Sequence, residues 1–156
     1  MPNHCHNRVT IYGSGNDTEE TREQIAKLKE IFEGESIFTH FIPEPNWPKT
    51  PVTLGYEMRY GMTRANVGEL PLPDGTFKST GLRDERWYDW RLQNWDTKWD
   101  AYDVTIDDDD PDQLEVSFET AWSPPEAVCH AMRDQYPDLA VSWFYDEPGC
   151  EIAGYL

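Results

Sequence analysis

The sequence is poor in basic residues, and its last third almost lacks them. Residues 100–156 hold fifteen acidic side chains and one basic side chain, Arg133. Because proteins bind nucleic acid and anionic membranes through Lys and Arg, this composition argues against both kinds of direct binding. The chain of 156 residues has a formal net charge of −17, of which −14 falls in this region. A field of this sign favours solubility and attracts cationic partners.

Long apolar runs and a cysteine framework are missing as well. No segment approaches the roughly 20 apolar residues that cross a bilayer, and no apolar stretch follows a basic start. The three cysteines, Cys5, Cys129 and Cys150, are odd in number and widely spaced. We therefore expect a soluble, unexported protein with reduced thiols, located in a cytoplasm.

Motifs that carry chemistry are equally scarce. His4, Cys5 and His6 stand together, but neighbouring strand residues point to opposite faces and zinc requires four ligands. The aspartate run from Asp107 fails the EF-hand pattern, because Asp112 and Phe118 occupy the positions that require Gly and Glu. The sequence therefore predicts no catalytic residue, no metal and no cofactor. A small metal-dependent hydrolase or nuclease that uses these carboxylates remains an alternative.

The first third of the sequence predicts a strand followed by a helix. Val9 and Ile11 alternate with polar residues over 8–12, which indicates a half-buried strand. Asp17, with Glu20 three residues later, predicts the start of a helix that runs to residue 33. Residues 37–42 fit either a short strand or the entry into a loop.

The middle of the chain is rich in Pro and Gly. Four prolines fall within residues 43–51, which forbids regular structure there, and Pro73-Asp74-Gly75 is a turn signal. We read residues 43–83 as an insertion with some local order, because a structureless loop of this length is unusual in a compact domain. A short helix over 85–94, capped by Asp84, follows.

The stretch Trp87–Asp100 contains four of the seven Trp residues. It could form a stacking platform for bases or sugars. Trp at this spacing is more often part of a core, so we interpret the stretch as a hydrophobic seam that joins the insertion to the main domain.

After residue 100 the pattern changes to period two. Apolar and acidic residues alternate over 102–107 and again over 114–119, which predicts a β-hairpin with one apolar and one acidic face. Ser123-Pro124-Pro125-Glu126 predicts a helix with Ser123 as its N-cap, ending before Pro137. Strands over 140–145 and 151–155 complete the chain.

Without the insertion, the order of elements is β-α-β-β-α-β with one further strand. This order predicts an α+β, ferredoxin-like fold: an antiparallel sheet with two helices on one face, an extra C-terminal strand, and a Pro/Gly-rich insertion after the first helix. We expect a single domain over residues 1–156, with the insertion at about 43–99.

Three segments resemble a known family. These are Pro2-Asn3-x-Cys5-x-Asn7-x-Val9, Asn94-Trp95-x-Thr97-Lys98-Trp99-Asp100-Ala101 and Thr120-Ala121-Trp122-Ser123-Pro124-Pro125. Together they resemble the YubB-like ferredoxin-like domain family of bacteriophages, plasmids and their hosts. The resemblance implies the same fold and a mobile-element origin in a bacterial cell, but no activity. The chain departs from the family pattern at His4, where the family has Trp, and at Asp96, where it has Gly.

The acidic face of the hairpin is the least ordinary feature. In a ferredoxin-like sheet the face opposite the helices is open, and residues two apart on a strand lie roughly 7 Å from one another. The residues predicted to bind a partner there are Asp103, Asp107, Asp108, Asp109, Asp110, Asp112, Glu115 and Glu119. The alternative is that these carboxylates only form a solvated face that keeps an edge of the sheet from aggregating.

These observations favour a non-enzymatic, acidic interaction protein of a phage or other mobile element. Its partner would be a host protein or nucleoprotein complex with a basic, nucleic-acid-binding surface. The most concrete form is a nucleic-acid mimic that inhibits a host defence nuclease complex, in the manner of an anti-CRISPR protein. A structural or housekeeping module whose acidity serves only solubility is a further alternative.

Overall fold

The computed structural model describes residues 3–15, 18–50, 69–71, 73–79 and 85–156. The chain forms two compact units, one made of Met1–Pro43 with Asn94–Leu156 and the other of Glu44–Gln93. The first contains the sheet and its two covering helices. The second contains what is described of the Pro/Gly-rich part of the sequence.

The first unit is built on a five-stranded sheet in which every neighbouring pair is antiparallel. Its strands stand in the order β4-β5-β1-β6-β7. Their bounds are β1 His4–Gly13, β4 Tyr102–Asp110, β5 Gln113–Ala121, β6 Leu139–Glu147 and β7 Ile152–Tyr155. The predicted ferredoxin-like fold, with its extra C-terminal strand, is confirmed. β4 and β7 are the two edges.

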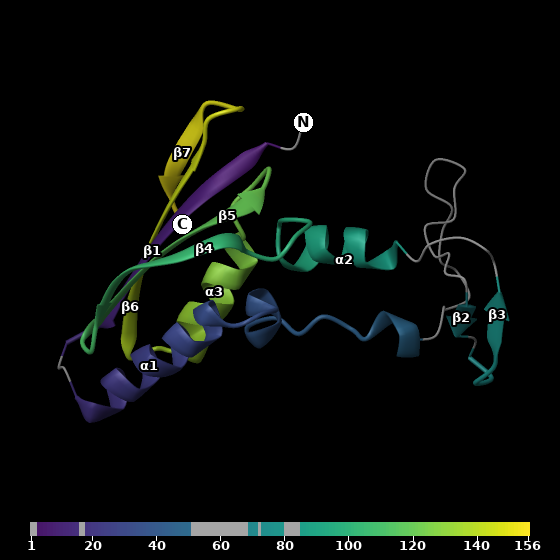
Figure 1. Ribbon diagram of the computed structural model, residues 1–156, viewed down its shortest axis with the longest axis horizontal. Helices are drawn as coiled ribbons and strands as arrows, with labels where there is room; N and C mark the ends of the chain where they lie inside the picture. The colour runs from purple at the N-terminus through teal and green to yellow at the C-terminus, as the bar shows by residue number, and fades with distance from the viewer. Residues whose placement is uncertain (1–2, 16–17, 51–68, 72, 80–84) are drawn as a thin grey trace. The chain divides into compact units, whose positions relative to one another are not determined.

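Two helices, α1 (Glu19–Glu33) and α3 (Glu126–Gln135), lie on the same side of this sheet (Figure 1). The strands alternate accordingly. On β1 the side chains of Cys5, Asn7 and Val9 are buried, and those between them are exposed. One face of the sheet therefore forms the core, and the opposite face is open.

The core centres on Phe118 of β5, which is 2% exposed. Its ring lies 5.9 Å from Phe32 of α1, 5.5 Å from Trp143 of β6 and 6.1 Å from Phe38, measured between centroids. Trp95 completes the cluster with an edge-to-face contact to Phe38 at 5.6 Å. Aromatic pairs at these separations add to the stabilisation from burial.

The starts of both helices differ from the prediction. Thr18, not Asp17, is the N-cap of α1: Thr21 N donates to Thr18 Oγ1, and Thr18 N donates to Thr21 Oγ1. Asp17 itself lies outside the described residues. α3 begins after Pro125, so Ser123 is not its N-cap. The predicted strand or loop entry at 37–42 is instead a 3₁₀-helix, η1 (Ile37–His40).

In the second unit, β2 (Glu69–Pro71) and β3 (Phe77–Ser79) form a two-stranded antiparallel pair. The predicted turn is confirmed there: Gly75 has a φ of 84°, and Asp74 Oδ1 accepts from Thr76 N and Oγ1. The insertion thus has the local order that was expected of it. The unit also holds a 3₁₀-helix, η2 (Trp47–Lys49), so the expectation that the prolines exclude regular structure over 43–51 is wrong. Nearly all of α2 (Arg86–Asn94) belongs to this unit too, and its predicted cap Asp84 is not among the described residues.

Two arginines, the buried Arg86 and the half-buried Arg91, bind the α2 side of this unit to the segment before it. Arg86 is 4% exposed and donates to the carbonyl oxygens of Thr50 and Trp47. Arg91 forms a bidentate pair with Glu44, whose carboxylate also accepts from Trp47 Nε1 at 2.9 Å. Charge-assisted bonds of this kind are stronger than neutral ones, so they fix the aromatic side chains beside them.

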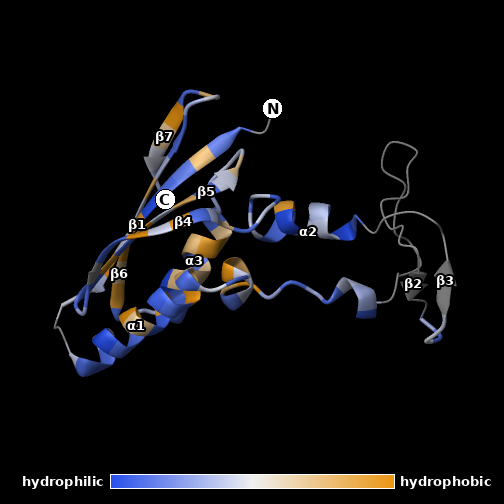
Figure 2. Cartoon of the chain, viewed as in Figure 1, coloured by the Kyte–Doolittle hydropathy of each residue, from blue (hydrophilic) through white to orange (hydrophobic). Residues whose placement is uncertain are grey.

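The helix and strand layers of the first unit differ in hydropathy (Figure 2). α1 is mostly hydrophilic along its length, whereas β6 carries the apolar residues that face the core. No helix within the described parts of the chain is long and apolar enough to span a membrane.

Candidate functional site

The open face of the sheet carries two of the predicted carboxylates, Glu115 and Glu119 of β5. Both are half-buried, and they lie opposite Thr10 and His6 of β1. Cross-strand partners share a face of the sheet, so His6 and Thr10 lie on the open face. Arg8 is two residues from each of them on β1, and it therefore lies on the open face as well. This face is therefore mixed in charge rather than uniformly acidic.

A β-bulge near the start of β4 changes the face on which its first residues lie. The register shifts between Tyr102 and Thr105, and Asp103 has a φ of 50°. Tyr102 consequently pairs with Glu119 and lies on the open face, so its predicted place on the apolar face is wrong. Asp103 is exposed and falls outside the paired positions of the ladder, as expected of a residue in a bulge.

A second bulge in β4 puts Asp108, instead of the predicted Asp107, at the position that pairs with β5 on the open face. The register shifts again between Ile106 and Asp108, which leaves Asp107 unpaired in the ladder and sets Asp108 opposite Glu115. Both aspartates are exposed. Two like charges directly opposite each other are destabilising, and the bond from Gln113 Nε2 to Asp108 Oδ2, 3.2 Å long, offsets part of that cost.

Glu119 is held by two histidines. His4 Nδ1 lies 2.9 Å from one of its oxygens and His6 Nδ1 lies 3.1 Å from the other. The Tyr102 hydroxyl oxygen lies 2.7 Å from the same His4 nitrogen. Glu119 therefore already has partners within the protein, and it contributes less to an outward-facing acidic surface than the sequence suggested.

The hairpin tip is joined to α1 by an ion pair. Arg22 donates to both oxygens of Asp112, over 2.6 and 3.3 Å. These bonds hold the pKa of Asp112 below its usual range. Asp112 N in turn donates to Asp110 Oδ1 over 2.9 Å, which shapes the turn. Asp109 lies opposite Leu114 in the ladder, and its side chain is outside the described part of the structure.

This ion pair brings a second set of acids beside the first. Glu19 and Glu23 of α1 line the same groove as Asp110, a hollow of about 450 Å³ between the helix and the hairpin tip. We call these acids together the acidic edge: Glu19, Glu23 and Asp110 line the groove, Asp112 is paired with Arg22, and Asp107 and Asp108 precede Asp110 on β4. The two glutamates were missed in the sequence, because nothing there shows that the first turns of α1 and a hairpin some ninety residues later become neighbours.

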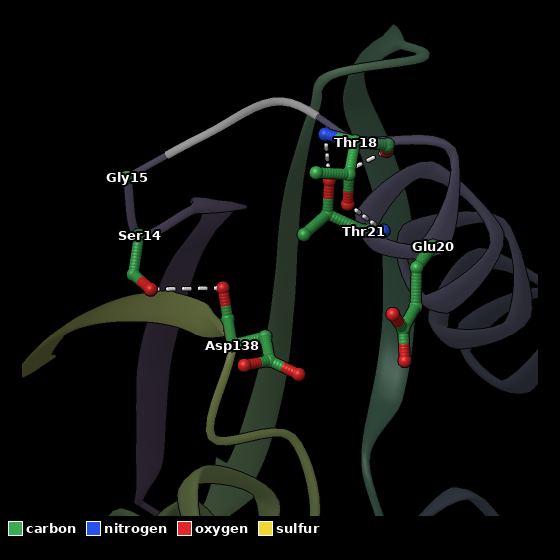
Figure 3. A pocket seen from close by; sticks show the side chains of 6 residues that line it. All are labelled: Ser14, Gly15, Thr18, Glu20, Thr21 and Asp138. Atoms are coloured by element: carbon green, nitrogen blue, oxygen red, sulfur yellow. Dashed lines mark hydrogen bonds between the residues drawn. The ribbon is translucent and has the colours of Figure 1, made fainter.

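A second hollow, of about 330 Å³, lies at the other side of the same helix end (Figure 3). Ser14 donates from N and Oγ to the Asp138 carbonyl, over 3.0 and 2.9 Å. Thr18 and Thr21 form the opposite wall. Carboxylates of Glu20 and Asp138 line it, so it is unsuited to an anion.

The cysteines lack the features of nucleophiles. Burial is the main reason that the pKa of Cys5 and that of Cys129 are raised to about 11. The exposed Cys150 has its pKa raised chiefly by a hydrogen bond to Glu147. Thiols in these settings stay protonated at neutral pH and react slowly. Among the described residues no group of three or more His, Cys, Asp or Glu is arranged to hold a metal ion.

The Trp-rich stretch is divided between the two units. Trp95 is fully buried in the first unit and donates from Nε1 to Ile42 O over 3.0 Å. Trp99 is 37% exposed, with Lys98 Nζ 4.5 Å from its ring centroid. In the second unit, Trp90 makes an edge-to-face contact with Trp47. The expected core role is therefore confirmed for Trp95, while the predicted seam between the insertion and the main domain stays a prediction.

Three segments that resembled a family in sequence converge at one end of the sheet. Asn7 Nδ2 donates to Thr120 Oγ1 over 2.9 Å, and Trp122 N donates to Asn3 O over 3.0 Å. Thr97 Oγ1 donates to Ala121 O over 2.9 Å. These three segments therefore supply a set of structural hydrogen bonds, placed away from the acidic edge in the sheet register.

Asp96 belongs to the same end of the sheet. Its Oδ2 accepts from Ala127 N in the first turn of α3 over 2.8 Å, and its backbone oxygen accepts from Ser123 Oγ. The cap of α3 is thus supplied by a side chain some thirty residues earlier in the chain.

Comparisons with known proteins support the fold. Residues 94–156 match a family described as the ferredoxin-like domain in Api92-like protein. Across both units the structure is similar to the crystal structure of the protein Api92 from Yersinia pseudotuberculosis, with a TM-score of 0.50 and 12% sequence identity, over 99% of this chain and 93% of that chain. No curated protein matches the sequence. At this identity the likeness concerns the fold alone.

Proposed function

We propose that this chain is a non-enzymatic interaction protein whose acidic edge binds a basic, nucleic-acid-binding surface of another protein. The observation that carries the proposal is the gathering of acids from two distant parts of the sequence at one place. Glu19, Glu23, Asp107 and Asp110 are all exposed, and none forms an ion pair with a described residue. Carboxylates in this state are available to cations on a partner.

The mechanism is electrostatic attraction followed by direct bonding. A net charge of −17 accelerates the encounter with a cationic surface, and the effect weakens as salt screens it. At contact, carboxylates accept charge-assisted hydrogen bonds from Arg and Lys, which are shorter and stronger than neutral bonds. Binding of this kind requires no chemical step and no cofactor.

The finer form of the proposal draws on the sequence resemblance to the YubB-like family. On that basis the protein is a product of a phage or other mobile element that acts in the cytoplasm of a bacterial host. The carboxylates of the acidic edge then take the place of nucleic-acid phosphates on a host defence nuclease complex. Such a protein would compete with nucleic acid for the same Arg and Lys residues.

Charge reversal at the acidic edge tests this proposal. The test variant combines Glu23→Lys, Asp107→Lys and Asp110→Lys. The control combines Glu35→Lys, Asp134→Lys and Glu151→Lys, which are exposed acids outside the acidic edge. Each triple variant changes the net charge by +6, from −17 to −11, so overall charge is matched.

The measurement is capture of partners from a bacterial lysate at low and high salt, followed by affinity measurement with the purified partner. We expect the edge variant to lose at least about tenfold in affinity, or ~1.4 kcal/mol, and the control to stay near wild type. Equal losses in both variants would show that only total charge matters and would contradict a defined site. Stabilisation by Mg²⁺, Mn²⁺ or Zn²⁺ in a thermal shift assay would favour the metal-dependent hydrolase instead.

A further inference from the structure

The groove between α1 and the hairpin tip combines an apolar floor with an acidic rim. Ile25 and Ala26 of α1 and Pro111 and Leu114 of the hairpin supply apolar surface, within a volume of about 450 Å³. Ile25 and Leu114 are almost fully buried, at 4% and 1% exposure, so they anchor the groove to the core, and its accessible apolar surface is that of the exposed Ala26 and Pro111. A volume of this size accommodates a long side chain and part of its backbone.

The rim carries acids and two cations, and the cations are already engaged. Arg22 is bonded to Asp112, and Lys29 Nζ lies 3.8 Å from Glu33 Oε1. The remaining rim charges are those of Glu19, Glu23 and Asp110, which have no ion-pair partner among the described residues. The groove therefore presents three uncompensated carboxylates around an apolar surface.

We propose that this groove receives an arginine side chain of the basic partner. This inference rests on the proposed function and names the contact through which the acidic edge holds its partner. The aliphatic stem of the arginine lies on Ala26 and Pro111, the exposed apolar residues of the groove, while the guanidinium reaches the carboxylates of the rim. Side chains that combine an apolar stem with a charged head favour surfaces of this kind.

Arginine suits the groove better than lysine for two reasons. Its planar guanidinium donates in a fork that matches carboxylates at more than one position, as Glu19, Glu23 and Asp110 provide. It is also less strongly hydrated than an ammonium group, so that less favourable solvation is lost when it enters a groove with an apolar floor.

Nuclear magnetic resonance titration of the whole chain tests the groove with small probes. The probes are N-acetyl-arginine amide, N-acetyl-lysine amide and N-acetyl-norleucine amide. We expect saturable shifts of the methyl signals of Ile25, Ala26 and Leu114, with tighter binding of the arginine amide than of the lysine amide and none of the norleucine amide. Equal binding of all three, or shifts that never saturate with any of them, would overturn the proposal.

Filling the groove without changing its charge provides the second test. Ala26→Leu adds volume at an exposed helical position where Leu has nearly the helix propensity of Ala, so the variant is expected to fold. Ala153→Leu, at an exposed position on β7, is the matched control. We expect Ala26→Leu to abolish the saturable shifts and to lower the affinity for the captured partner at least about tenfold. The control should change neither the shifts nor the affinity.

These results separate the inference from the proposed function. If Ala26→Leu binds the partner as wild type does while the edge charge reversal abolishes binding, the groove inference fails and the proposed function stands. If the charge reversal leaves binding unchanged, the proposed function fails. In that case the titration with N-acetyl-arginine amide still shows whether the groove binds an arginine side chain.

Discussion

At the residue scale, Asp96 shows how one side chain can carry two opposing effects. Its φ is 63°, a conformation that costs most side chains roughly 1–2 kcal/mol relative to Gly. Its carboxylate also accepts from Ala127 N and so caps α3, which contributes about 1 kcal/mol. Glycine at this position would remove both the cost and the cap.

Asp96→Gly is therefore expected to leave the free energy of unfolding within about 1 kcal/mol of wild type, because the two effects offset each other. Asp96→Ala loses the cap and keeps the backbone cost, so it should be less stable than the glycine variant by about 1–2 kcal/mol. Urea unfolding measures both. Asp96→Asn, which retains the conformation and an acceptor, is the control, and equal stability of the Ala and Gly variants would contradict this account.

Asn7 is a second residue whose role is structural. It is 2% exposed, donates to Cys5 O and Thr120 Oγ1, and accepts from Trp143 Nε1 over 3.0 Å. Asn7→Ala would leave the buried Trp143 Nε1 without its acceptor, remove one of the two bonds of Thr120 Oγ1 and create a small void. We expect a loss of about 3 kcal/mol in the free energy of unfolding, measured by urea denaturation.

Ser142→Ala, a polar truncation at a half-buried position of the neighbouring strand, is the control for Asn7, with an expected change within about 0.5 kcal/mol. A comparably small change in Asn7→Ala would show that the hydrogen bonds converging at this end of the sheet contribute little to stability.

At the element scale, local patterns in the sequence predicted which elements exist but not how they touch. The alternation over 102–107 and 114–119 identified the hairpin, and helical spacing identified α1. The two bulges of β4 were not predictable, because a bulge keeps the composition of a strand while it shifts the face of each following residue. The same limit applies to the site: its aspartates were visible in the sequence, whereas Glu19 and Glu23 joined them only through tertiary contact.

The Arg22–Asp112 ion pair links α1 to the hairpin tip. The titration of the Asp112 carboxyl group reports on this link. Arg22 holds the pKa of Asp112 below its ordinary value of 3.8 in the folded state. A carboxyl group with a lowered folded pKa contributes stability that is present above its unfolded pKa and is lost as the pH falls through its folded pKa. The link between the two elements is therefore intact at neutral pH and weakens only in strong acid.

Carbon-detected nuclear magnetic resonance titration of the Asp112 carboxyl group measures this pKa. We expect a value below 3.8 in the wild type and a return towards 3.8 in Arg22→Gln. Asp74, whose pKa is lowered by bonds from Thr76, should be unaffected by that substitution and serves as the internal reference. An unchanged Asp112 pKa in Arg22→Gln would show that the ion pair does not form in solution.

At the scale of the whole molecule, the excess of acidic residues has a cost that salt reveals. A net charge of −17 repels itself within a compact chain, and counterions screen this repulsion. The described ion pairs of Arg22, Lys29 and His130 oppose this repulsion only weakly, because their side chains are 29% or more exposed to solvent and such pairs contribute little. Repulsion is therefore expected to dominate the response of the fold to salt.

We expect the midpoint of thermal unfolding to rise with sodium chloride, by about 3 °C for each kcal/mol of repulsion that is screened. Differential scanning fluorimetry across a salt series measures it. The Glu35→Lys, Asp134→Lys, Glu151→Lys control variant, at a net charge of −11 after the change of +6, should show a smaller rise because it repels itself less. A midpoint that falls with salt would mean that attractive ion pairs, rather than the excess of carboxylates, govern the electrostatics of this fold.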